Sequence, residues 1–246
     1  MTLPTFVKPH HNYGSYDDYW RLVEVSGFPV CMDSEVEWNS KNTYIFTYFS
    51  FPLNAEMEWP ELPKHACYTV MWDIERWCEG KTIHPGVDEF WVSDKWYQSK
   101  LPGSEFVILG TTGVDDLALS KLYTFSTRDY RTDRRKRIIA EFEKMGSKFA
   151  PNTMERKHKE LLQSEVMLCM HQDTLPMTEP LRYALAASYN LPILAEYSQD
   201  FYPFEKGMEV ILEGDYRFYW LKYPTVNYGF KFNILQALGL EEYGKD

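Results

Sequence analysis

A regular alternation of apolar runs and helical segments, between about residues 120 and 200, constrains the fold of this chain more than any other feature. Four runs have the length and composition of strands: 122–126, 148–150, 166–170 and 192–195. Three segments between them have the apolar spacing or the end signals of helices: 132–146, 155–163 and 179–189. Strands that alternate with helices in this way pair in parallel through right-handed crossovers. The sequence therefore predicts a Rossmann-like α/β layer in this half of the chain.

Residues at the helix ends support these boundaries. Thr132 can accept a hydrogen bond from the first turn of one helix, and Gly146 can end that helix in a left-handed conformation. Thr178 can cap a later helix, and Pro180 fits its first turn, where a missing N–H costs nothing. Asn190 suits the end of the same helix.

The first half of the chain has a different pattern. Five short runs rich in β-forming residues are predicted to be strands: 30–32, 43–49, 67–72, 89–93 and 106–109. Pro52, Pro60 and Pro63 exclude a continuous helix or a central strand from residues 51–64. We expect a small sheet with short connections here.

The pattern changes after Gly110 and Gly113, which suggests a domain boundary. We expect a reduced α/β domain at 1–112, a nucleotide-binding domain at 113–214, and a tail at 215–246 that packs back on the body. The tail is aromatic and then weakly helical.

Composition narrows the class of protein. A hydrophobic share of 44% is that of a globular chain, and the formal net charge of −10 argues against a broad surface for duplex nucleic acid. The four cysteines are scattered without a zinc-binding spacing, so we expect free thiols in a reducing compartment. The N-terminus lacks the pattern of a signal peptide and no apolar run is long enough to span a membrane. These observations predict a cytoplasmic protein.

Two loops are candidates for ligand binding, because open parallel sheets bind ligands beyond the carboxyl ends of their strands. The first loop follows Ser126 and carries Arg128, Arg131, Arg134 and Arg135. Guanidinium groups can bind phosphate oxygens in pairs, so a diphosphate is a plausible ligand. The alternative is that these arginines only form the solvent-exposed face of a helix.

The second loop runs from His171 to Glu179. The Glu179 carboxylate could accept hydrogen bonds from ribose hydroxyls. A carboxylate in the first turn of a helix also complements the helix dipole. Position alone leaves both interpretations open.

The residues of these loops carry a family resemblance. The segment CMHQDTLPMTEPLRYALAASYNLPILAE (169–196) resembles the donor-binding stretch of glycosyltransferases with the GT-B fold. YTFSTRDYRTDRRKRIIAEFEKMG (123–146) resembles the first strand and helix of the same domain. YTVMWDIERW (68–77) and the segment from 87 to 116 are similar to the end of the N-terminal domain and the linker. The resemblance, to compact bacterial or bacteriophage members, implies an α/β fold of two Rossmann-like domains facing a cleft, the N-terminal one reduced.

The resemblance also implies roles for single residues. Glu179 would bind the donor ribose as the second acid of an EX7E pattern, and His171 stands in place of the first acid, where it could contact the sugar or the diphosphate. Arg135 is the candidate for the diphosphate, and Arg182 would support the loop or reach a phosphate. The expected donor site contains these side chains: Arg128, Arg135, His171, Gln172, Thr178, Glu179 and Arg182. Such enzymes need no metal and no cofactor besides the donor, here expected to be a UDP-sugar.

An inverting transferase needs a base for the proton of the acceptor hydroxyl. Three carboxylates at predicted strand ends of the first half are candidates: Asp33, Asp73 and Glu75. A helix cap by Asp73, or an ion pair of Glu75 with Arg76 or Arg128, explains these residues equally well.

The sequence thus suggests a metal-independent glycosyltransferase that moves a sugar from a nucleoside diphosphate to an acceptor hydroxyl. A hydroxymethylated base in bacteriophage DNA is one acceptor that the resemblance suggests, and such a base would have to leave the stack. The alternative is a catalytically silent protein that binds a nucleotide or nucleotide-sugar. A dinucleotide-dependent oxidoreductase is disfavoured because no GxGxxG follows a predicted strand.

Overall fold

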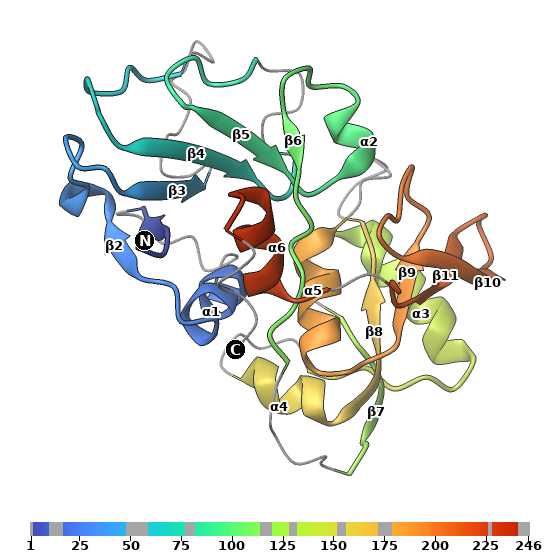
Figure 1. Cartoon of the computed structure of the whole chain (residues 1–246). Coiled ribbons are helices and arrows are strands. Elements are labelled where there is room, and N and C mark those ends of the chain that lie inside the picture. Colours follow the sequence, from blue (N-terminus) through green and yellow to red (C-terminus); the bar gives the residue numbers. More distant parts are fainter. Residues whose placement is uncertain are drawn as a thin grey trace. The chain divides into compact units, whose positions relative to one another are not determined.

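The chain folds into two compact α/β units in the computed structural model (Figure 1). The structure describes residues 2–9, 17–47, 59–76, 82–113, 120–127, 132–151, 156–171, 179–225 and 228–240. The first unit comprises Met1–Thr112 and Tyr228–Asp246, and the second comprises Gly113–Asn227. Among the described residues, no helix is both long and apolar enough to cross a membrane.

The described part of the first unit contains a six-stranded parallel sheet with the order β2-β1-β3-β4-β5-β6. Its strands are β1 (Thr5–Lys8), β2 (Val30–Met32), β3 (Thr43–Thr47), β4 (Tyr68–Asp73), β5 (Glu89–Val92) and β6 (Glu105–Phe106). The predicted runs 30–32, 43–49, 67–72 and 89–93 correspond to β2, β3, β4 and β5, with residues 48 and 49 outside the described part of the chain. The predicted run 106–109 overlaps β6 only at Phe106, where that strand ends, and β1 was not predicted. β1 is short, but it lies inside the sheet, where Phe6 and Val7 are fully buried.

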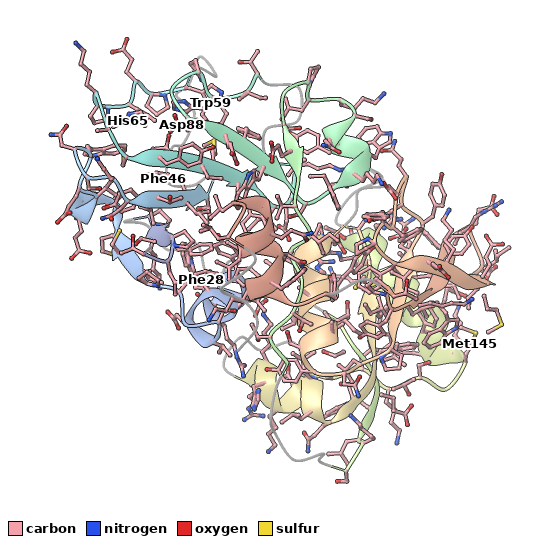
Figure 2. All side chains as sticks on the ribbon, viewed as in Figure 1. Phe28, Phe46, Trp59, His65, Asp88 and Met145 are labelled. Atoms are coloured by element: carbon pink, nitrogen blue, oxygen red, sulfur yellow. The ribbon has the colours of Figure 1, made fainter. Side chains whose placement is uncertain are left out.

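The helices of the first unit contribute aromatic side chains to its core. They are α1 (Asp17–Val25), the 3-10 helix η2 (Asp33–Glu35), α2 (Lys95–Gln98) and α6 (Phe230–Ala237). α1 buries Tyr19 and Val23, four positions apart and therefore on one helix face. Phe230 of α6 stacks on Trp72 of β4 with ring centroids 6.0 Å apart. Aromatic side chains thus form much of this core, and Figure 2 shows the side chains on the ribbon.

The second unit contains, in its described residues, a five-stranded mixed sheet with the order β10-β11-β9-β8-β7. β7 (Tyr123–Ser126), β8 (Ser164–Cys169) and β9 (Ile193–Glu196) are parallel. β11 (Arg217–Lys222) pairs antiparallel with β9, and β10 (Glu205–Ile211) pairs antiparallel with β11. The α/β prediction is confirmed at this level.

The predicted helices of the second unit are present as α3 (Asp133–Lys144), α4 (Lys157–Leu162) and α5 (Pro180–Ser188). Thr132 accepts a hydrogen bond from the Arg135 N–H at 3.3 Å, as a cap does. Gly146 and Asn190 have positive φ angles after α3 and α5. Thr178 lies outside the described residues, and the N-cap of α5 is Glu179, whose side chain makes no capping bond.

The segment 215–246 differs from the single tail that was expected. Its first part forms β11 inside the second sheet, whereas α6 belongs to the first unit. Phe218 and Leu221 of β11 are buried by this pairing. The sequence of β11 indicates only that its aromatic residues favour a strand. The position of this strand in the second sheet is set by its pairing with β9.

Candidate functional site

The order of strands reverses between β7 and β8 in the second unit. After β7 the chain passes through α3 to Phe149, which bridges Phe125 of β7 in parallel, and then reaches β8 on the other side of β7. Such a reversal opens a crevice at the carboxyl ends of the two strands, where ligands bind in open α/β sheets. Ser126 pairs with Met167 of β8, so the two loops chosen from the sequence leave neighbouring strands at one edge.

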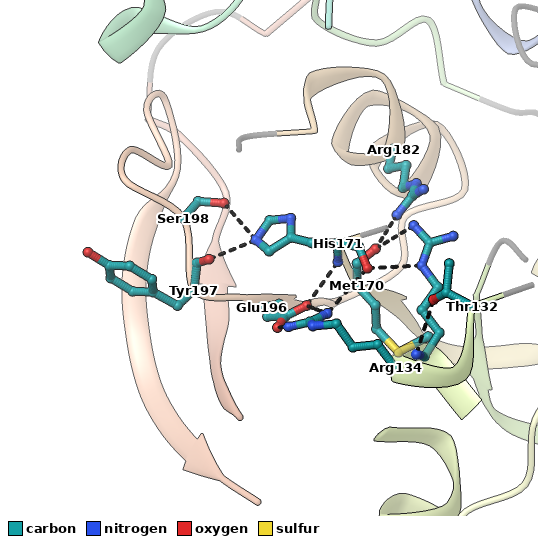
Figure 3. Close-up of polar contacts among 9 residues, drawn as sticks. Thr132, Arg134, Met170, His171, Arg182, Glu196, Tyr197 and Ser198 are labelled. Carbon is teal, nitrogen blue, oxygen red and sulfur yellow. Dashed lines mark hydrogen bonds and ion pairs between the residues drawn. The ribbon is translucent and has the colours of Figure 1, made fainter. Parts of the chain in front are cut away.

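Three arginines converge on the backbone at the carboxyl end of β8 (Figure 3). Arg135 donates from Nη2 to the Met170 carbonyl at 2.8 Å and from Nε to the His171 carbonyl at 3.1 Å. Arg182 donates to the Met170 carbonyl at 2.8 Å, and Arg134 donates to the His171 carbonyl at 3.3 Å. Each of these two carbonyls therefore accepts two guanidinium hydrogen bonds, which hold the end of the strand.

Two carboxylates complete this cluster. Glu196, the last residue of β9, accepts both ends of the Arg134 guanidinium and also the His171 N–H at 2.9 Å. Glu179 accepts from Arg182 at 2.7 Å. The three guanidinium groups and the two carboxylates thus form one hydrogen-bonded cluster at the ends of β8 and β9.

Arg135 makes backbone contacts that were not predicted from the sequence. Its side chain is only 3% exposed and donates to two backbone carbonyls. A buried guanidinium held in this way supports the loop, which is the role that the resemblance suggested for Arg182. Both arginines therefore position the strand end.

His171 presents a buried ring nitrogen at the same edge. Its Nε2 lies 2.7 Å from the Tyr197 carbonyl and 3.5 Å from the Ser198 hydroxyl. Its Nδ1 is buried and has no hydrogen-bond partner among the described residues. Buried polar atoms are nearly always paired, so an unpaired one needs an explanation.

Thr127, directly after β7, also carries a buried polar side-chain atom. The residue is 6% exposed, and within the described part of the chain its hydroxyl has no hydrogen-bond partner. Unpaired polar atoms thus occur after both strands that flank the reversal. Thr127 lies in the first candidate loop that was chosen from the sequence, but it was given no role of its own. Ser198 was not predicted, because nothing local distinguishes it from other hydroxyl residues.

Three of the predicted donor-site residues lie outside the described residues: Arg128, Gln172 and Thr178. The thiol of Cys169, also at the end of β8, is fully buried. Burial, and then the charge of Glu179, raise the pKa of this thiol and so disfavour its reactive thiolate form.

The first unit has its own reversal, between β1 and β3. Thr47, the last residue of β3, is 1% exposed, and its hydroxyl also has no partner among the residues that the structure describes. Asp73 ends the neighbouring strand β4 and is buried. Glu75 follows two residues later and is half-buried. Thr47 pairs with Trp72, so the side chains of Thr47 and Asp73 point to opposite faces of the sheet and the structure does not bring them together.

Asp33 lies apart from Asp73 and Glu75. It begins η2 after the edge strand β2 and accepts a hydrogen bond from the Ser34 N–H at 2.7 Å. β1 and β3 separate β2 from β4, which corresponds to a spacing of about 14 Å at ~4.8 Å per strand. The structure therefore does not bring Asp33 together with Asp73.

Arg76 occupies the turn after β4. It has a positive φ of 59° and forms a buried ion pair with Asp94, with Nε 2.7 Å from Oδ2. Its guanidinium also lies 4.5 Å from the centre of the Trp96 ring. This pair fixes the turn that carries Glu75.

No group of three or more metal-ligating side chains is found among the described residues. Comparisons with protein-family models, with curated proteins and with solved structures gave no match to this chain.

Proposed function

We propose that the second unit binds a nucleoside diphosphate sugar at the carboxyl ends of β7 and β8, and that the chain is a metal-independent glycosyltransferase of the GT-B kind. The two units would be its two domains. One observation carries the proposal: Thr127 Oγ1 and His171 Nδ1, at the strand reversal, are buried polar atoms without partners among the described residues.

Energetics support a ligand at this place. A buried polar atom without a hydrogen bond costs about 1–3 kcal/mol. A ligand rich in hydroxyls, such as a nucleotide sugar, would supply the missing bonds. The guanidinium groups that converge on Met170 and His171 would place positive charge near its diphosphate.

Glu179 fits the ribose in this proposal. Its side chain makes no capping hydrogen bond to α5, although its charge at the start of this helix still complements the helix dipole. Arg182 orients its carboxylate through a hydrogen bond of 2.7 Å. A carboxylate held in this way can accept hydrogen bonds from two neighbouring hydroxyls.

The acceptor would bind to the first unit, with Asp73 as the base. Asp73 would take the proton of the acceptor hydroxyl, the oxygen would attack the anomeric carbon of the sugar, and the nucleoside diphosphate would leave.

Charge favours a small acceptor over DNA. The first unit contains nineteen acidic and ten basic residues, whereas the second unit contains seventeen and sixteen. A polyanion such as DNA would be repelled by the unit proposed to receive it. We therefore favour a neutral or cationic acceptor over the hydroxymethylated DNA base.

Calorimetric titration with UDP, GDP and ADP tests the binding step. In Thr127→Val the shape of the side chain is kept and only the hydroxyl is lost, so we expect binding to weaken about tenfold without loss of stability. Ser188→Ala is the matched control, because it removes a buried hydroxyl at the last residue of α5, where it bonds to the Ala184 carbonyl.

The proposal fails if none of the three nucleotides binds, or if Thr127→Val binds them as tightly as the control Ser188→Ala and the unchanged chain do. Incubation with nucleotide sugars then tests catalysis. Binding without any release of nucleoside diphosphate, in the presence of a panel of acceptors, would support the catalytically silent alternative.

A further inference from the structure

We infer that the first unit carries a separate ligand site, a pocket at the amino ends of β4 and β5 that binds a small, neutral, planar aromatic molecule. Two short segments line this pocket, residues 59–65 and 84–86, and its volume is about 530 Å³. Pockets that hold small ligands commonly have volumes of about 300–1,000 Å³. The inference does not rest on the proposed function, because the donor and the base are placed at the carboxyl ends of strands.

The pocket lies at the opposite edge of the first sheet from Asp73. His65 and His84 of its lining come shortly before β4 and β5, whereas Asp73 is the last residue of β4. Figure 2 labels Trp59, His65 and Asp88 at this edge. β4 has six residues, so its two ends are about 17 Å apart at ~3.3 Å per residue. A small molecule in the pocket is therefore too far from the proposed base to be the acceptor.

The walls of the pocket are held in place before any ligand binds. Proline rings fix the backbone φ angle at three lining positions. These are Pro60, Pro63 and Pro85. Trp59 and Leu62 pack against the hydrophobic core of the first unit, and Trp59 Nε1 donates to the Thr82 carbonyl at 2.8 Å. Because little conformational freedom remains to be lost, binding of even a small molecule is favoured.

The ring nitrogens of His65 face groups of the protein. Its Nδ1 lies 2.9 Å from the Pro63 carbonyl. Its Nε2 lies 3.5 Å from the Thr69 hydroxyl and 3.9 Å from a carboxylate oxygen of Asp88. His65 therefore offers a ligand its ring carbons.

The ring of His84 is engaged in the same way. Its Nδ1 accepts a hydrogen bond from the Gly86 N–H at 3.0 Å, and the ring also bonds to the backbone of Pro60. Burial lowers the pKa of His84, which favours the neutral ring. The Trp59 ring lies beside it, with ring centroids 5.2 Å apart. The three rings of the pocket thus present apolar faces and edges, which pair best with another flat aromatic ring.

The charged side chains of the lining have opposite signs. Glu61 and Lys64 are both exposed, so water and salt screen their charges. This pair gives neither an anion nor a cation a clear advantage. A neutral ring instead gains from the removal of apolar surface from water. We therefore assign an uncharged ligand to the pocket.

Three fluorinated indoles test this assignment, because they share one ring and differ in charge. The neutral probe is 5-fluoro-3-methylindole, the anion is 5-fluoroindole-3-acetate and the cation is 5-fluorotryptamine. Fluorine NMR of each probe, titrated with the full chain at neutral pH, gives the dissociation constants. We expect a value of about 1 mM or lower for the neutral probe, as for a good fragment-sized ligand. Neither charged probe should bind more than about threefold more tightly.

Two substitutions of Trp59 separate ring stacking from burial of apolar surface. Both lose the hydrogen bond to Thr82, but Trp59→Phe keeps an aromatic face and Trp59→Leu does not. The dissociation constant of the neutral probe should rise about threefold in Trp59→Phe and about tenfold or more in Trp59→Leu, since stacked rings gain more than their buried area alone. Denaturant unfolding shows whether each variant is folded.

Gly86→Ala narrows the pocket and leaves Trp59 in place. The added Cβ would lie 3.2 Å from Cε1 of His84 and 3.3 Å from Cδ1 of Leu62, between two lining side chains. We expect the dissociation constant of the neutral probe to rise about threefold or more. Lys64→Gln and Glu61→Gln are the matched controls, because they change charge in the same lining and should leave binding unchanged.

Four results would overturn the inference. They are no binding of any probe, tighter binding of a charged probe by about tenfold or more, equal binding by Trp59→Leu, Gly86→Ala and the unchanged chain, and a loss in either control as large as in Gly86→Ala. If Trp59→Leu does not fold, Gly86→Ala and the three probes decide. None of these results depends on nucleotide binding, so the proposed function stands or fails separately.

Discussion

Arg135 on α3 and Arg182 on α5 both donate a hydrogen bond to the carbonyl oxygen of Met170, each at a distance of 2.8 Å. Two helices that are far apart in sequence are thereby tied to the end of β8. Because the site begins directly after this strand, its geometry depends on charged side chains that hold the backbone. Replacing them should change stability as well as binding.

Arg135→Met should destabilise the second unit by about 2–4 kcal/mol, because buried carbonyls lose charge-assisted hydrogen bonds. Arg135→Lys should recover little, since an ammonium group cannot reproduce the two-pronged contact. Denaturant unfolding measures both. Lys136→Met, which removes an exposed pair with Asp133, is the control and should cost less than about 1 kcal/mol. Equal stability of Arg135→Met and the control would contradict a supporting role.

Gly110→Ala should destabilise the first unit by about 2–4 kcal/mol. Gly110 has a φ of +73°, and an added Cβ would lie 2.6 Å from the Tyr228 carbonyl oxygen and 2.7 Å from the Asn233 amide nitrogen. It would thereby disturb the bridge between Thr111 and Gly229. Gly113→Ala is the matched control, since Gly113 has the same φ but open space around it, and we expect a cost of about 1 kcal/mol from the backbone alone. Similar unfolding midpoints for the two variants would contradict a steric clash between the added Cβ at position 110 and the Tyr228 carbonyl oxygen.

The first unit should lose stability in acid through His84. Burial lowers the pKa of this imidazole below its ordinary value of 6.5, so the folded state binds fewer protons than the unfolded state as the pH falls. The contribution of the neutral His84 side chain to stability is therefore complete above about pH 6.5 and is lost as the pH falls below it. The free energy of unfolding should fall by at most about 1.4 kcal/mol per pH unit. His84→Gln should be less stable at neutral pH but less sensitive to acid. Denaturant unfolding at several pH values measures the slope, and an unchanged slope in the variant would be evidence against this assignment.

Asp73→Asn should lower kcat for sugar transfer by about 10²–10⁴-fold while nucleotide binding stays unchanged, because only the base is removed. Asp33→Asn should leave kcat near that of the unchanged chain, since β1 and β3 lie between its strand and β4. Steady-state kinetics compares them once a donor and an acceptor are identified. A large loss in Asp33→Asn with none in Asp73→Asn would reverse the assignment of the base.

The sequence by itself predicted the elements whose signals are local. The apolar runs and helix ends between residues 120 and 200 located β7, β8, β9 and their helices, because periodicity and caps such as Thr132 depend on neighbouring residues. It also identified the two loops at the strand reversal, since the rule for parallel sheets needs only the order of strands and helices.

The tertiary structure decided which side chains meet. The pairing of β11 with β9, the place of α6 in the first unit, and the burial of β1 all follow from contacts between distant segments. The same holds for the site: Arg135 carries the charge expected of a phosphate ligand, but its hydrogen bonds are made to the carbonyls of Met170 and His171. The unpaired atoms of Thr127 and His171 are defined only when the surrounding strands are in place, because burial and the lack of a partner are properties of the packed sheet.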